Sequence, residues 1–450
     1  MTKQLIKMQQ YEVYKDSSIE WLGKIPEQWI LKKIAHLFLN VGSGTTPSSG
    51  NVSFYGGSIP WLQTGDLTDS DINSTSKTVT EKALRVHSTL KKYKPGSLVV
   101  AMYGATIGKV GLLSIETTTN QAYCVIEKNS FINMKYVFYL FLGFRKKIIS
   151  MAYGGGQPNI SQDLIKNLRL PFPDKKEQTA IANFLDQKTT QIDHAVAIKE
   201  KQITLLKERK QILIQNAVTR GLNPYAPMRD SGVEWIGEIP AHWIVKKVKH
   251  VTSKIGSGIT PSGGGTTYLD KGIPLLRSQN VHFGKIDMTD VAFISPETHD
   301  SMSNSKVKKG DVLLNITGGS IGRCHFVAHG EEMNVNQHVC ILRPTQLIHP
   351  EYLNGLIASQ VDQGQIWFFQ QGGGREGLNF QAIKNFFIPL PTTNEQATIV
   401  THITTESGKI NKAITVQQQQ IEKLKEYKTT LINSAVTGKI KVINQNIEGL

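Results

Sequence analysis

The sequence predicts an α+β protein made of two copies of one module, in which a long helix follows each copy. Three observations carry this prediction. The chain contains an internal repeat, short apolar runs of strand type lie among Gly, Ser and Thr, and two further segments show a heptad pattern with almost no Gly or Pro. With 450 residues, the chain has room for two or three domains.

The repeat is clearest near the start of each copy. Over 34 aligned positions that begin at Lys15 and Arg229, 18 residues are identical, with an offset of 214. The offset grows to 218 by Glu177 and Glu395, so we expect the length changes to lie in loops. The chain is therefore a tandem duplication with pseudo-twofold symmetry. Two copies are too few for a solenoid.

The repeat and the change in composition predict five segments. They are an N-terminal extension at 1–14, an α+β domain at 15–173, a spacer helix at 174–222, a second α+β domain at 229–391 and a second spacer helix at 392–440. The strand-type runs in the two domains are Ile59–Leu62, Leu98–Met102, Tyr123–Ile126, Ile273–Leu276, Val312–Ile316 and Val339–Leu342. Further helices are predicted at Met134–Tyr153 and Glu351–Gln371.

The two spacer segments carry matching heptads. Their seams include Leu185, Ile192, Lys199, Leu206 and Leu213 in the first copy, and Ile403, Ile410, Gln417, Leu424 and Leu431 in the second. About 44 helical residues extend roughly 66 Å, and one such helix alone would leave its apolar stripe in water. We therefore expect the two helices to pair within the chain as an antiparallel coiled coil. Symmetric pairing between two copies of the chain is the alternative.

Charge and cysteine content narrow the functional class. Lys and Arg number 51 against 36 Asp and Glu, a net charge of +15, which favours a polyanionic partner such as nucleic acid. The cysteines Cys124, Cys324 and Cys340 are too few for a disulfide framework or a four-thiolate zinc site. No apolar run is long enough to span a bilayer and no signal peptide is recognisable. The sequence thus predicts a cytoplasmic protein without a membrane partner.

Several short segments resemble catalytic motifs but lack the residues or neighbouring elements that those motifs require. Gly372–Gly377 matches the dinucleotide-binding pattern but follows a predicted helix instead of a strand. Gly104–Lys109 is one residue short of a phosphate loop, and Asn223–Tyr225 lacks a proline of the adenine-methyltransferase loop. The histidines offer no metal-ligand spacing with an acidic partner. We therefore predict no catalytic residues and no metal site.

Several motifs together resemble one known family. They are Asp230–Trp243, Ile59–Asp66, Met102–Gly108, Asn120–Gln121, Gly154–Ser161, and Pro171–Pro173 followed by Glu177–Gln178. In this order they resemble the DNA specificity subunits of type I restriction–modification systems, across about 15–440. The segments 15–173 and 229–391 resemble that family's target-recognition domains. Each motif alone is weak, but the ordered duplication is specific.

The resemblance implies a noncatalytic subunit that binds a bipartite double-stranded DNA site, one half-site per recognition domain. It implies as partners two adenine-methyltransferase (M) subunits and the ATP-dependent restriction (R) subunits. The chain itself would bind no cofactor, with S-adenosylmethionine, ATP and Mg expected on those partner subunits. The alternatives are a homodimeric sequence-specific DNA-binding regulator, or a DNA methyltransferase or nuclease with an unrecognised site.

Candidate DNA-binding residues follow from this interpretation. Arg and Lys typically read guanine, and Asn and Gln typically read adenine. The candidates for base contacts lie on glycine-rich, repeat-equivalent loops: Gln63, Thr64, Asp66, Gln157, Asn159, Arg277, Gln279, Asn280, Arg375 and Asn379. The candidates for phosphate contacts are Lys32, Lys33, Lys246 and Lys247. For each, an ordinary turn-forming or solvent-exposed role is the alternative. The glycine runs at 42–44 and 256–258 either approach phosphate or make a turn.

Overall fold

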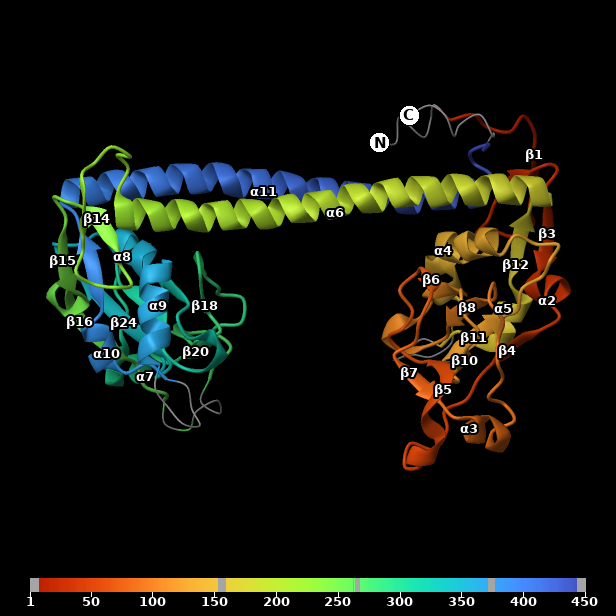
Figure 1. Ribbon diagram of the computed structural model, residues 1–450, viewed down its shortest axis with the longest axis horizontal. Coiled ribbons are helices and arrows are strands. Elements are labelled where there is room, and N and C mark those ends of the chain that lie inside the picture. Colours follow the sequence, from red (N-terminus) through yellow and green to blue (C-terminus); the bar gives the residue numbers. More distant parts are fainter. Residues whose placement is uncertain (1–7, 153–158, 262, 264–267, 371–376, 443–450) are drawn as a thin grey trace. The chain divides into compact units, whose positions relative to one another are not determined.

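The computed structural model describes residues 8–152, 159–261, 263, 268–370 and 377–442. Two compact units divide the chain (Figure 1). Unit 1 takes the residues up to Glu200 together with those from Gln418 onward, and unit 2 is the continuous stretch Lys201–Gln417. Each unit holds one copy of the α+β module and part of each long helix. The division into five segments stays a sequence prediction. Each compact unit combines a module with parts of the long helices, so the borders of the units do not follow the borders of the five segments.

Unit 1 contains a five-stranded sheet, a three-stranded sheet and a two-stranded sheet beside a helix. The five-stranded sheet has the order β4 (Val41–Ser43), β11 (Tyr123–Ile126), β8 (Leu98–Ala101), β9 (Val110–Leu113), β6 (Asp71–Ile72). The second sheet has the order β10 (Thr118–Thr119), β5 (Tyr55–Leu62), β7 (Lys77–Val79), and the third pairs β12 (Arg169–Phe172) with β3 (Ile30–Lys33). The remaining elements are the hairpin β1 (Tyr14–Asp16) with β2 (Lys24–Pro26), α2 (Ile34–Leu37), α3 (Glu81–Val86), α4 (Met134–Ser150), α5 (Gln162–Asn167), η1 (Val52–Phe54) and η2 (Gly104–Thr106).

Unit 2 repeats this plan. Its largest sheet has the order β16 (Thr252–Ser257), β24 (Val339–Pro344), β21 (Val312–Asn315), β22 (Cys324–Phe326). Its other sheets are β20 (Ala292–Ile294), β17 (Ile273–Leu276), β23 (Asn334–Val335), and β15 (Ile244–Lys247) with β25 (Phe387–Leu390). The hairpins are β13 (Met228–Asp230) with β14 (Glu238–Pro240) and β18 (Val281–His282) with β19 (Lys285–Ile286). The helices are α7 (Pro296–Ser301), α8 (Pro350–Ile357), α9 (Gln360–Phe369), α10 (Phe380–Lys384), η3 (Val248–His250), η5 (Ser303–Ser305) and η6 (Gly318–Ser320).

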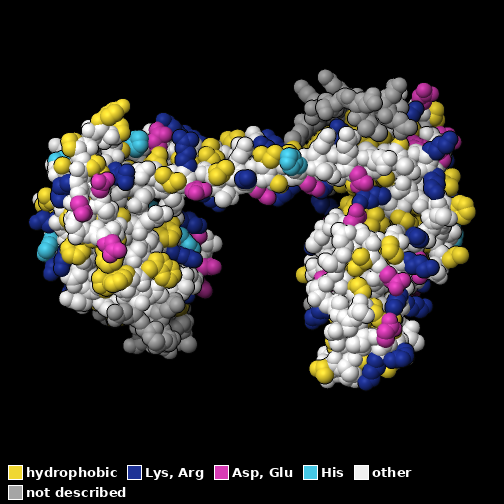
Figure 2. Space-filling view, viewed as in Figure 1, with side chains coloured by type: hydrophobic (Ala, Val, Ile, Leu, Met, Phe, Trp, Pro, Cys, Tyr) yellow, Lys and Arg dark blue, Asp and Glu magenta, His cyan; other side chains and the backbone are white. Residues whose placement is uncertain are grey.

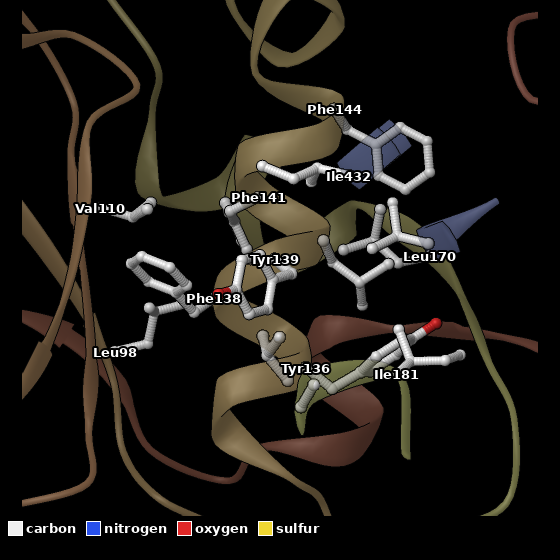
Figure 3. Packing of buried hydrophobic residues seen from close by; sticks show 14 of the residues in the cluster. Leu98, Val110, Tyr136, Phe138, Tyr139, Phe141, Phe144, Leu170, Ile181 and Ile432 are labelled. Carbon is white, nitrogen blue, oxygen red and sulfur yellow. The ribbon is translucent and has the colours of Figure 1, made fainter. Parts of the chain in front are cut away.

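The central strands are buried on both faces, which explains their unbroken apolar runs. In β8, Leu98 and Val100 join the core beneath α4, whereas Val99 and Ala101 face a second cluster on the other side of the sheet. Figure 3 shows Phe138 of α4 directed at Leu98 and Val110. All six strand-type runs predicted from the sequence lie on strands of the two units.

The helix prediction holds for the first copy and is wrong in detail for the second. Helix α4 is continuous, but the equivalent stretch of unit 2 breaks into α8 and α9. Ser359 stands at the break with extended backbone angles, φ −75° and ψ 160°. Apolar periodicity continues through this break, so the pattern alone could not locate it.

The long helices are α6 (Lys175–Arg220) and α11 (Thr393–Val436), and the predicted antiparallel pairing is confirmed. Within unit 1, Lys428 of α11 donates to both carboxylate oxygens of Asp193 of α6, at 2.7 Å each. Within unit 2, Lys210 of α6 donates to Asn411 of α11 at 3.1 Å. Residue numbers rise along α6 in the direction in which they fall along α11, so the two helices run antiparallel. Lys199, a polar residue of the predicted seam, likewise donates across the pair to Gln420 of α11 at 2.5 Å.

Each module completes its core with residues of both helices. The core of unit 1 includes Leu431, Ile432, Ala435 and Val436 of α11, besides residues of α6. The core of unit 2 likewise includes Ala217 and Val218 of α6 and Ile399 of α11. The helix pair is thus part of both hydrophobic cores.

The cores also hold tryptophans and the three cysteines. Trp29 and Trp243 are fully buried, and Trp21 and Trp235 pack half-buried against the same cores. All three cysteines are free and buried, and burial raises the pKa of each thiol. In the part of the chain that the structure describes, no helix has the length and apolar content needed to cross a membrane.

Candidate nucleic-acid interface

A glycine-rich loop follows β4 in unit 1 and β16 in unit 2, and close packing explains its glycines. A Cβ added to Gly44 would lie 1.7 Å from the carbonyl oxygen of Thr119, and one added to Gly258 would lie 1.6 Å from that of Val335. No side chain fits so near another backbone. These two glycines therefore let the loop approach a strand of the protein itself, which favours a structural role over a phosphate contact.

One hydrogen bond ties this loop to the Asn–Gln turn in both units. Thr46 donates to the side-chain oxygen of Gln121 at 2.5 Å, and Thr260 makes the same bond to Gln337. Both glutamines are exposed. Each follows a buried asparagine whose side chain accepts from the backbone two residues later. The sequence analysis quoted this turn as a motif but did not propose Gln121 or Gln337 as DNA-binding residues.

The loop after β5 holds the first group of predicted base readers. Gln63 donates from its side chain to Ser76 at 3.0 Å, and Thr64 is exposed. Beside them is an open pocket of about 600 Å³ lined by Thr46, Ser49, Tyr55, Gly56, Trp61, Gln63, Ser76, Lys77 and Thr78. Unit 1 therefore brings Gln63 and the loop bearing Thr46 to one surface.

Asp66 and Asn280 are repeat equivalents, and the structure gives both a turn-forming role. Asp66 accepts from the backbone N–H of Gln63 at 2.9 Å and of Ser76 at 3.3 Å. Asn280 accepts from the N–H of Arg277 at 2.9 Å and donates to the carbonyl of Asp287 at 2.9 Å. Asn280 is only 1% exposed, so the turn would have to open before its side chain could reach a base. This burial favours the turn-forming role, and base reading by Asn280 stays a prediction.

Arg277 and Gln279 remain candidate readers in unit 2. Arg277 stacks on Tyr268, with its guanidinium carbon 5.7 Å from the ring centroid. It donates to the carbonyl of Asp290 at 2.8 Å, and the exposed Gln279 reaches the same oxygen at 3.5 Å. Arg277 occupies the repeat position of Gln63. The two units thus present different donors from the same turn.

The second group of predicted base readers consists of Gln157, Asn159, Arg375 and Asn379. Asn379 caps α10, accepting from the N–H of Ala382 at 2.8 Å. Its repeat equivalent, Ser161, caps α5 in the same way, which favours a capping role for Asn379 over base reading. Asn159 is exposed. Gln157 and Arg375 lie outside the described residues.

The predicted phosphate-binding lysines lie on other strands. Lys32 and Lys33 are on β3, and Lys246 and Lys247 on β15, each paired with the strand that precedes a long helix. Lys33 donates to Asn167 and Lys247 to Asn385, both at 3.2 Å, whereas Lys32 and Lys246 are exposed. The structure therefore does not bring these lysines onto the sheet that carries the β5 or β17 loop.

Basic side chains are dispersed on the face of the molecule that Figure 2 shows. Figure 2 shows Lys and Arg side chains spread over the visible face of both units instead of gathered in one patch. Among the residues that the structure describes, no group of three His, Cys, Asp or Glu side chains could hold a metal ion. The arrangement offers amide, hydroxyl and guanidinium groups for hydrogen bonding from loops that the fold supports.

Comparisons with known proteins agree with this arrangement. The model of the type I restriction modification DNA specificity domain matches residues 26–207 and again 241–426. The chain is 25% identical over 442 residues to the type I restriction enzyme MjaVIII specificity subunit of Methanocaldococcus jannaschii, covering 97% of this chain and 99% of that one. It is 24% identical over 407 residues to the EcoKI specificity subunit of Escherichia coli K12, covering 85% and 82%.

Solved structures share the fold. A chain from a type I R-M system superposes with a TM-score of 0.69 at 15% identity, covering 92% of this chain and 98% of that one. The HsdS subunit of Thermoanaerobacter tengcongensis gives 0.53 at 16% identity, covering 94% and 100%. The resemblance inferred from the motifs is thereby confirmed, and the chain belongs to the type I restriction–modification DNA specificity family.

Proposed function

We propose that this protein is the noncatalytic DNA specificity subunit of a type I restriction–modification complex, and that each α+β module binds one half of a bipartite double-stranded DNA site. One observation carries the proposal. The loop fastened by Thr46 and Gln121 in unit 1 recurs with Thr260 and Gln337 in unit 2. The same framework, built twice, supports two readers.

The differences between the two readers support distinct half-sites. At one turn position unit 1 has Gln63 and unit 2 has Arg277. A glutamine amide pairs best with adenine, whereas a guanidinium pairs best with guanine. The net charge of +15 supplies affinity that does not depend on sequence and that weakens as salt rises. Gln121, Gln279 and Gln337 join Gln63 and Arg277 as the exposed or half-exposed donors of the proposed interface.

The partners and cofactors follow from this role. The chain recruits two methyltransferase (M) subunits and the restriction (R) subunits, and it works in the cytoplasm. S-adenosylmethionine, ATP and Mg bind to those partner subunits, and the chain itself holds no cofactor. Family membership and the duplicated module support this assignment.

The proposal is tested by methylation with a domain graft. The purified chain alone is expected to leave DNA unmethylated and uncut, and to direct methylation once an M subunit is added. Replacing 229–391 with the equivalent domain of another specificity subunit should change one half-site of the methylated sequence and leave the other intact. A graft of 15–173 is the matched control and should change the opposite half-site.

Two results would contradict the proposal. Methylation or cleavage by the chain alone would show that it is catalytic. A graft that altered both half-sites together would show that the two modules do not read independently. Methylome sequencing of a host with and without each graft provides the readout.

A further inference from the structure

A chain of side-chain hydrogen bonds runs through the proposed interface of unit 2, and Gln337 lies in the middle of it. The hydroxyl of Thr260 donates to the side-chain oxygen of Gln337. The amide nitrogen of Gln337 lies 3.2 Å from the ring Nε2 of His338. The ring Nδ1 of His338 lies 2.7 Å from the hydroxyl oxygen of Thr317. Both ends of the Gln337 amide thus have a partner, although this side chain is exposed.

The chemistry of the amide decides which ring nitrogen of His338 carries the hydrogen. An amide nitrogen can only donate, so the ring Nε2 accepts from Gln337 and carries no hydrogen. The one N–H of the neutral ring is then on Nδ1, and it donates to the hydroxyl oxygen of Thr317. Every donor in the chain therefore points the same way, from Thr260 towards Thr317. An amide turned over by half a rotation would require the opposite ring tautomer.

Backbone contacts hold the two residues that support the amide. The N–H of His338 donates to the side-chain oxygen of Asn336 at 3.1 Å, and its carbonyl accepts from the N–H of Ile316 at 3.0 Å. Thr317 follows directly and pairs with Gly377 in an isolated β-bridge. Since both residues are fixed through their backbones, the half-buried imidazole has a defined place beside the exposed amide.

Unit 1 shares only part of this arrangement. The hydrogen bond from threonine to glutamine is common to both units, but the imidazole is not. Ala122 stands at the repeat position of His338, and Tyr103 stands at that of Thr317. Because the module of unit 1 folds with alanine at this place, the fold does not require the imidazole. This difference favours a role of His338 in reading over a role in folding.

The orientation of the amide determines what Gln337 can read. After its bonds to Thr260 and His338, the amide oxygen keeps a second lone pair and the nitrogen keeps a second hydrogen. An acceptor and a donor side by side are the groups with which glutamine binds the N6 and N7 atoms of adenine. If the amide turned over, the acceptor and the donor would exchange places, and the same adenine would no longer match.

We propose that His338 is a positioning residue for base reading in unit 2. Its ring Nε2 holds the amide nitrogen of Gln337, so the amide offers an adenine its acceptor and its donor in one fixed order. The base preference of unit 2 then depends on a residue that acts through Gln337 and that unit 1 replaces with alanine. This inference rests on the proposed DNA-reading function and names one base that the function involves.

The first test needs no DNA. In the full-length protein with isotope-labelled histidine, the NMR signals of the ring nitrogens show which of them carries the hydrogen. The signals that disappear in His338→Ala identify this residue, and the variant should fold because unit 1 has alanine at the equivalent position. We expect the hydrogen of the neutral ring on Nδ1. A neutral His338 with its hydrogen on Nε2 would overturn the proposal.

The second test is methylation by the complex with an M subunit, on DNAs in which each base of the unit 2 half-site is replaced in turn. His338→Ala should lower the preference for adenine at one position about fivefold or more, which is the discrimination that one good bidentate contact provides. The half-site of unit 1 should be read as before. His250→Ala changes an exposed histidine of η3 and is the matched control, which should keep the full preference. An unchanged preference in His338→Ala would refute the positioning role.

A double variant shows whether His338 acts through Gln337. Gln337→Ala alone should lose the same preference, and adding His338→Ala should change nothing further, because both substitutions remove one interaction. Losses that multiply would show that His338 acts independently of Gln337 and would contradict the proposal. Failure of the wild-type complex to methylate any DNA would refute the proposed function itself, a result distinct from methylation with an unchanged preference.

Discussion

The substitution Gly258→Ala should disable one reader and spare the other. The added methyl carbon would lie 1.6 Å from the carbonyl oxygen of Val335, and real contacts of this kind stay beyond 3.0 Å. The loop and the strand must therefore separate by about 1.4 Å. That movement pulls Thr260 from Gln337 and displaces the loop at the proposed interface.

The expected cost follows from overpacking. Forcing one methyl group into a close-packed contact typically costs about 1–3 kcal/mol, so the free energy of unfolding of unit 2 should fall by that amount. If the displaced loop also loses its DNA contacts, 1.4 kcal/mol corresponds to about a tenfold loss of affinity. Gly256→Ala is the matched control, because a Cβ at Gly256 meets nothing within 4 Å.

The assay is binding to the bipartite site found by methylome sequencing, measured at fixed salt with each half-site replaced in turn. On DNA that lacks the half-site read by unit 2, Gly258→Ala should bind as well as the wild type, because that contact is already gone. In Gly44→Ala the added Cβ would lie 1.7 Å from the carbonyl oxygen of Thr119. This variant should bind as well as the wild type only on DNA that lacks the half-site read by unit 1. Equal loss on both altered DNAs, or no loss on the intact site, would refute the reasoning.

Two further predictions concern stability and spacing. Burial raises the pKa of Asp362 well above its usual value, so the folded state binds more protons than the unfolded state and the carboxyl destabilises the fold increasingly as pH rises above about 4. The free energy of unfolding of Asp362→Asn, measured in urea, should therefore exceed that of the wild type by more at about pH 8 than at about pH 5. An equal difference between variant and wild type at both pH values would contradict this. If the length of the helix pair sets the unread gap between the two half-sites, seven residues inserted beside Lys199 and seven beside its partner Gln420 should change that gap. The insertions keep the heptad, add roughly 10 Å of helix and match about three base pairs of DNA. These base pairs also rotate one half-site by about 100° around the duplex, so we expect methylation of sites with a longer gap, or loss of methylation. Methylation of sites with the original gap at the wild-type rate would show that the helix pair does not set the gap.

The repeat predicted the architecture well because duplication preserves what the core requires. The strand-type runs and the two long helices follow from apolar periodicity, which burial enforces in both copies. The partners of the polar seam residues could not be predicted, because heptads specify faces and not which residues meet. The pairing of Asp193 with Lys428 became visible only in the structure.

The candidate readers were harder to predict for a chemical reason. Asn and Asp read bases through the same short polar groups with which they cap helices and close turns. Asn379 and Asn280 carry the right groups, but they use them on their own backbone. Gln121 and Gln337 lie beyond such a turn residue and remain exposed. A repeat-equivalent Asn followed by Gln was the signal that could have identified them.

The division of the chain into a continuous and a discontinuous unit has a consequence for synthesis. Unit 2 is one uninterrupted stretch, whereas the core of unit 1 needs Leu431, Ile432 and Val436. Translation proceeds at about 5–20 residues per second, so the first module waits roughly 10 to 50 s on the ribosome for the helix that closes it. During that interval its apolar surface is uncovered, although it was made first. The second module, made later, is expected to reach its native packing earlier.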